Sequence, residues 1–156
     1  MIFVISGRIN MKSACKILFS FAVPRKDYMN LDYLSSPKEC VTGVKKGEKN
    51  TFIAIFGLHA LPGNPINIYA SISSVGKEPP LDSAKPGDAI SQTLRATPLP
   101  DGMGVFLMAV EVKDVVFEDD GLYEINVRIF PSDETPSKKN EIDSIRSFFF
   151  VLTAKG

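Results

Sequence analysis

The sequence predicts an all-β protein, folded as a two-sheet sandwich of roughly seven to eight strands. Three observations lead to this prediction. Apolar residues recur with a period of two in several segments, prolines and glycines separate those segments, and no long stretch shows the 3.6-residue period of an amphipathic helix. Short strands without intervening helices are typical of a sandwich or a barrel, and we favour the sandwich.

Length and charge bound the classes of protein. A chain of 156 residues suits one domain, because cores usually divide only beyond about 250 residues. We expect residues 16–156 to form the sandwich and residues 1–15 to form an N-terminal arm or a first strand. The 18 basic and 18 acidic side chains balance, which argues against broad nucleic-acid binding. No apolar run reaches the roughly 18 residues that a membrane span requires.

Two segments show the strand pattern most clearly. In residues 123–129, apolar side chains alternate with Glu124, Asn126 and Arg128, as expected for a strand with one buried face. Residues 66–73 repeat this alternation. Five further segments are apolar enough to be strands: 17–23, 51–58, 91–96, 105–112 and 147–152.

Turn formers separate these strands. Residues 61–65 read Leu-Pro-Gly-Asn-Pro, and residues 98–104 hold two prolines and two glycines. Residues 25–49 form an unusual connection. Within it, residues 27–34 carry apolar side chains at helical spacing, although an extended connection fits nearly as well.

An acidic turn directly precedes the strand at 123–129. Asp119, Gly121 and Tyr123 match the Asp-x-Gly-x-Tyr spacing of the tyrosine corner and so resemble immunoglobulin-like folds, in which the tyrosine hydroxyl bonds backwards to the main chain. Ile125 stands where antibody domains carry a cysteine, and the chain has no tryptophan, so the resemblance implies shared architecture only. The order and spacing of strands over residues 16–152 also look like those of small uncharacterised bacterial proteins, which implies no activity.

Residues able to perform chemistry are few. His59 is the only histidine, and at a strand end beside a proline turn it reads more readily as a surface or packed residue than as a general base. Glu118, Asp119 and Asp120 lack the spacing of a calcium loop and are better explained by the corner. Nucleophile and nucleotide-binding motifs are missing. We therefore expect a protein that is not an enzyme and holds neither cofactor nor metal.

Two of the predicted strands, 105–112 and 148–152, are apolar on both faces. Side chains alternate across a strand, so one core can bury only half of each. We expect Phe106, Met108, Val110, Phe148 and Phe150 to point inward. The outer surface would then carry a candidate interface of four side chains: Val105, Leu107, Phe149 and Val151.

Leaving such side chains in water is unfavourable, because burying each is worth about 1.5–3 kcal/mol. One arrangement covers them within the molecule, by the arm at residues 2–5 or by the segment at residues 28–34. The other arrangement is a homodimer interface or a docking surface for a protein partner.

We therefore expect a non-catalytic binding module that acts on protein, through this outer surface or through the proline-rich loops. The alternative is a small-molecule or carbohydrate-binding module with Tyr28, Tyr33 and Tyr69 as stacking surfaces. Cys15 and Cys40 allow one pairing, which the sequence leaves open, and there is no Asn-x-Ser/Thr acceptor. The default location is cytoplasmic, with secretion as the alternative.

Overall fold

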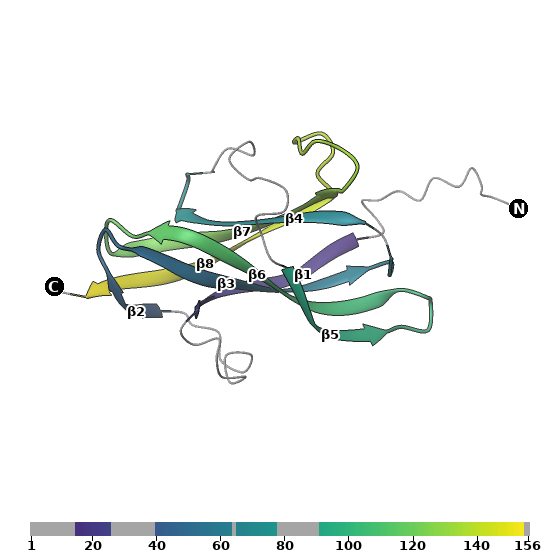
Figure 1. Ribbon diagram of the computed structural model, residues 1–156, viewed down its shortest axis with the longest axis horizontal. Coiled ribbons are helices and arrows are strands. Elements are labelled where there is room, and N and C mark those ends of the chain that lie inside the picture. The colour runs from purple at the N-terminus through teal and green to yellow at the C-terminus, as the bar shows by residue number, and fades with distance from the viewer. Residues whose placement is uncertain (1–14, 26–39, 64, 78–90, 155–156) are drawn as a thin grey trace, which may run out of the picture.

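The computed structural model describes residues 15–25, 40–63, 65–77 and 91–154, which fold into two packed β-sheets (Figure 1). No residue in these ranges is α-helical. The predicted all-β sandwich is therefore confirmed. The strands are β1 (Cys15–Pro24), β2 (Cys40–Lys45), β3 (Lys49–Ala60), β4 (Ile66–Ser74), β5 (Ser91–Pro98), β6 (Gly104–Val116), β7 (Gly121–Pro131) and β8 (Asp143–Ala154).

Each sheet has four strands. The first sheet has the order β1-β3-β6-β5, with every pair antiparallel. The second sheet has the order β2-β8-β7-β4, in which β2 runs parallel to β8 and the other pairs are antiparallel. Most neighbours in a sheet are therefore distant in sequence.

Strand β2 was not among the predicted strands, since it falls in the stretch interpreted as a connection. It is only six residues long and pairs with the last strand of the chain. A segment this short has no periodicity of its own, so its strand conformation depends on a partner more than a hundred residues away. Residues 1–14 of the predicted N-terminal arm, the helix candidate at 27–34 and both covering segments lie outside the described residues, and Cys15 is the first residue of β1.

The main core lies between the sheets, and β3 shows how it is built. Phe52, Ala54 and Phe56 belong to this core, whereas Ile53 and Ile55 belong to a second apolar cluster on the opposite face of the first sheet. Because β3 is central in its sheet and apolar on both faces, both sets of side chains are buried. The first sheet is thus apolar on its inner and its outer face.

Strand β7 is also buried on both faces, and here the prediction of one exposed polar face was wrong. Glu124, Asn126 and Arg128 are at most 7% exposed. The strand lies between β8 and β4, and the Nε of Arg128 donates a hydrogen bond of 2.9 Å to Glu141. A central strand with an internal ion pair can bury polar side chains that its sequence pattern assigns to solvent.

Strand β1 joins the two sheets. Its main-chain pairing is with β3, but the Asp143 carboxylate of β8 accepts a hydrogen bond of 2.7 Å from the amide of Ile17, and the hydroxyls of Ser20 and Ser147 lie 2.6 Å apart. A β-bulge between Ile17 and Phe19 shifts the register of β1. This bulge determines which side chains of β1 reach the outer face.

Candidate binding surfaces

The corner residues lie together at the start of β7. The Tyr123 hydroxyl donates a hydrogen bond of 2.8 Å to the main-chain oxygen of Asp119, and Gly121 has a φ of 149°. The Tyr123 ring packs edge-on against Phe117, with ring centroids 4.8 Å apart. The tyrosine therefore links the turn to the core.

The acidic side chains of this corner already have partners. Asp120 Oδ1 accepts hydrogen bonds from the amide and the hydroxyl of Thr153, at 2.7 and 2.6 Å, which attaches the end of β8 to the corner. Asp119 lies 3.7 Å from Lys46 Nζ. Within the described ranges, no group of three or more His, Cys, Asp or Glu side chains could hold a metal ion.

Two members of the predicted interface have the opposite orientation to the one expected. Phe149 and Val151 are in the core, at 4% and 0% exposure, rather than on the outer surface. Phe149 stacks against Phe52 and Tyr123, with ring centroids 6.1 and 6.4 Å apart. All three residues of the run Phe148–Phe150 are apolar, so their hydrophobicity does not indicate which of them face the core. Pairing with β7 decides this, since Phe149 lies opposite Tyr123.

The side chains predicted to point inward from β8 are the exposed ones. Phe148 is 55% exposed, Phe150 42% and Leu152 45%, and Leu122 of β7, which pairs directly with Phe150, is 50% exposed. We call these four residues the phenylalanine patch. They alternate with core residues and so form one continuous apolar area on the outer face of the second sheet. Together they expose on the order of 350 Å² of apolar surface.

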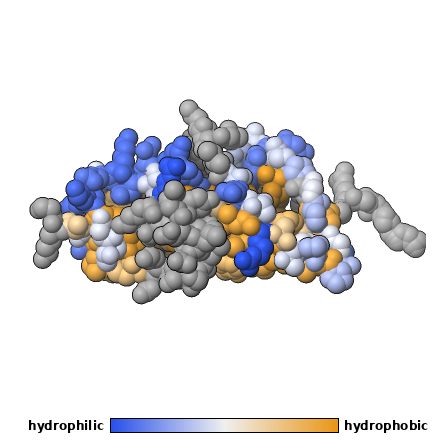
Figure 2. All heavy atoms as spheres, turned by 60° about the horizontal axis from the view of Figure 1, so that its bottom comes forward, coloured by the Kyte–Doolittle hydropathy of each residue, from blue (hydrophilic) through white to orange (hydrophobic). Residues whose placement is uncertain are grey.

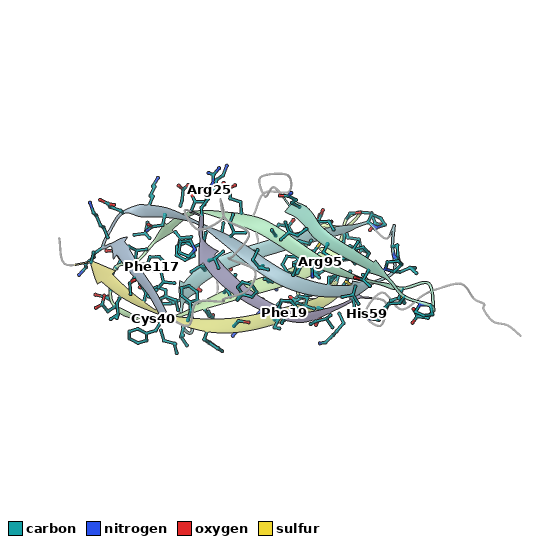
Figure 3. All side chains as sticks on the ribbon, turned by 90° about the horizontal axis from the view of Figure 1, so that it is seen from below. Phe19, Arg25, Cys40, His59, Arg95 and Phe117 are labelled. Atoms are coloured by element: carbon teal, nitrogen blue, oxygen red, sulfur yellow. The ribbon has the colours of Figure 1, made fainter. Side chains whose placement is uncertain are left out.

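The other two predicted interface residues do lie on the outer face of the first sheet. Val105 and Leu107 alternate with the core residues Phe106 and Met108 on β6. They line a groove of about 360 Å³ together with Phe19 and Phe21 of β1, Gly57 of β3, and Arg95 and Thr97 of β5. We call this the aromatic groove. Phe19 and Arg95 lie toward the same end of the sheet, and Arg25 lies toward the other (Figure 3).

Apolar and polar surface are separated on the molecule. In the view of Figure 2, hydrophobic side chains gather along the lower part of the face and hydrophilic ones along its upper margin. Phe19, Gly57 and Arg95 were missed by the sequence analysis. The face of β1 on which Phe19 lies depends on a bulge, and the groove that the three residues line depends on the order of the strands. Such pairing between distant segments leaves no local pattern.

The remaining candidates are placed as follows. His59 lies near the end of β3, between Lys16 and Val105 on the neighbouring strands. Tyr69 is only 8% exposed and packs edge-on against Phe130, so it is not the exposed stacking surface that the carbohydrate hypothesis requires. Burial also raises the pKa of Tyr69. Tyr28 and Tyr33 lie outside the described residues.

Both cysteine thiols are free. Cys15 is buried, and burial together with the nearby Asp143 carboxylate raises its pKa from 9.0 to about 11. Its thiol therefore stays protonated at neutral pH. No helix in the described part of the chain is long and apolar enough to cross a membrane.

A comparison with protein-family models finds no match, and a search of curated proteins finds no significantly similar sequence.

Proposed function

We propose that this chain is a non-catalytic, immunoglobulin-like binding module that recognises protein through the phenylalanine patch. The strand order supports the immunoglobulin-like part. When β1, β3, β4, β5, β6, β7 and β8 are lettered A to G, the sheets β1-β3-β6-β5 and β8-β7-β4 have the ABED and GFC orders of that fold. Strand β2 is then an additional strand beside G.

The corner supports the same architecture. In immunoglobulin-like domains a tyrosine near the start of strand F bonds back to the main chain a few residues upstream. Tyr123 lies at the start of β7, the strand lettered F, and bonds to the carbonyl of Asp119. We therefore interpret Asp119, Gly121 and Tyr123 as a tyrosine corner that stabilises the domain rather than as a binding site.

The phenylalanine patch is the observation that carries the binding function. Aromatic side chains are enriched in the central part of protein interfaces, where they are surrounded by polar groups. On one side the patch is bordered by the exposed polar residue Thr42, which pairs with Leu152. Its exposed area of about 350 Å² is less than half the roughly 800 Å² that each partner buries in a standard interface. The patch would therefore be the centre of an interface that extends onto its polar surroundings.

Self-association through the phenylalanine patch can be tested with the purified protein alone. We expect the mass measured by light scattering or sedimentation to rise with concentration between about 10 and 300 µM, as for a dimer of micromolar affinity. Leu152→Ser should lower the affinity by about tenfold or more, because it removes apolar surface from the interface.

Leu18→Ser is the matched control for this experiment. Leu18 is 48% exposed, nearly the same as Leu152, but it lies on β1 of the other sheet. We expect this variant to associate as the wild type does. The proposal fails if the wild-type chain is monomeric throughout and also retains no protein from a lysate that a Leu152→Ser bait loses.

A further inference from the structure

The aromatic groove has a floor at Gly57, where β3 carries no side chain. A Cβ atom at this position would lie 2.4 Å from Cε1 of Phe19, closer than carbon atoms approach without displacement. The Phe19 ring therefore lies against the β3 backbone, in the space that a side chain would fill. Gly57 thus lets the Phe19 ring pack close to the sheet, at the base of a groove whose other lining residues include Leu107.

One wall of the groove is aromatic. Phe19 and Phe21 lie nearly parallel, with ring centroids 6.3 Å apart and an interplanar angle of 10°. Phe19 and Phe21 share a face because they are two residues apart, and the β-bulge between Ile17 and Phe19 makes this the face opposite to that of the core residue Ile17. Phe19 is 43% exposed there. A bulge that re-aims a side chain in this way is a common device beside binding sites. A flat apolar group can pack against these rings by offset or edge-on contact.

The opposite wall is polar and positively charged. Arg95 and Thr97 lie two residues apart on β5, pair with Leu107 and Val105, and line the groove. Among the described residues, no carboxylate lines the groove and none forms an ion pair with Arg95. Phe19 and Arg95 lie on the two outer strands of the sheet, three strand spacings or about 14 Å apart along the sheet.

We propose that the aromatic groove binds a small aromatic carboxylate. Its ring would lie in the groove against Phe19 and Leu107, and its carboxylate would accept hydrogen bonds from the guanidinium of Arg95 and the hydroxyl of Thr97. Arginine binds a carboxylate with paired, charge-assisted hydrogen bonds, which makes it the natural anchor for such a ligand. A groove of about 360 Å³ with apolar walls and a few convergent polar groups has the dimensions of a small-ligand site. This site is on the opposite sheet from the phenylalanine patch, so the two proposals are independent.

The test is a titration of the ¹⁵N-labelled full chain with 2-naphthoate, followed by NMR chemical shifts. We expect saturable shifts of amides on β1, β3, β5 and β6, with a Kd between about 20 µM and 1 mM for a ligand of this size. 2-Naphthalenemethanol, which keeps the ring but lacks the charge, should bind about tenfold more weakly. The absence of saturable shifts, or saturable shifts on the second sheet instead, would overturn the proposal.

Two arginine variants separate specific recognition from general attraction. Arg95→Gln should weaken binding of 2-naphthoate by about tenfold and leave binding of the neutral alcohol unchanged. Arg25→Gln is the matched control, because Arg25 forms an ion pair with Glu111 at 3.7 Å and does not line the groove. It should bind 2-naphthoate as the wild type does. If Arg95→Gln binds like the wild type, or if both variants weaken binding equally, the assignment of the carboxylate to Arg95 is wrong.

Discussion

Tyr69 and Tyr123 offer a matched test of what a buried hydroxyl contributes to this fold. Both are 8% exposed, and both pack edge-on against a phenylalanine ring. They differ at the hydroxyl. That of Tyr123 donates to the carbonyl of Asp119, whereas that of Tyr69 is buried and has no hydrogen-bond partner in the part of the chain that the structure describes. Tyr→Phe at each position therefore removes one hydroxyl and leaves ring packing in place.

The expected effects have opposite signs. Tyr123→Phe loses a hydrogen bond with a net value of about 1 kcal/mol, and should lower the free energy of unfolding by that amount. Tyr69→Phe removes a hydroxyl that was desolvated without compensation, and should raise the free energy of unfolding by up to about 1 kcal/mol. The two variants should then differ by about 2 kcal/mol, or by 4–8 °C in Tm for a domain of this size.

Urea unfolding followed by circular dichroism measures both values, and equal m-values would confirm that the substitutions leave the extent of unfolding unchanged. If the two substitutions destabilise the protein equally, the hydrogen bond of Tyr123 has no specific role in stability. A stabilised Tyr123→Phe would also contradict its interpretation as a structural corner.

Three further predictions test the strand phase, the groove floor and the buried thiol. In urea unfolding, Phe149→Ala should lower the free energy of unfolding by about 3–5 kcal/mol, whereas Phe148→Ala should stay within about 0.5 kcal/mol of the wild type. The reverse order would mean that Phe148, and not Phe149, faces the core. Gly57→Ala should destabilise by about 1–3 kcal/mol, because its methyl group meets the aromatic ring packed above it, and an unchanged Tm would contradict that contact. In the folded chain Cys40 should react with a thiol reagent at pH 8 much faster than Cys15, whose raised pKa keeps it protonated. Since the unfolded chain loses this proton near pH 9.0 and the folded chain only near pH 11, stability should fall as the pH rises between these values, and a flat profile would contradict the shift.

The two outer faces show how far local sequence patterns reach. The sequence predicted that β6 and β8 are apolar on both faces, so that each sheet would have apolar side chains on its outer surface. Both sheets do have apolar outer surfaces. For β6 the sequence also predicted correctly which side chains face the core, because the glycine and polar residues in and around this strand are consistent with only one alternation. For β8 the predicted inward and outward side chains were reversed, because Phe148 and Phe149 are equally hydrophobic and their order gives no indication of which one faces the core.

The alternation of side chains, the breaks between strands and the acidic turn before β7 are local properties, which can be predicted from the sequence. Strand order, the bulge in β1 and the inward face of β8 depend on contacts between distant segments. They do so because a β-strand completes its hydrogen bonds with a partner elsewhere in the chain, as β2 does with β8. The choice of that partner and its register positions Arg95 opposite Phe19 across the groove and turns Phe148 toward solvent.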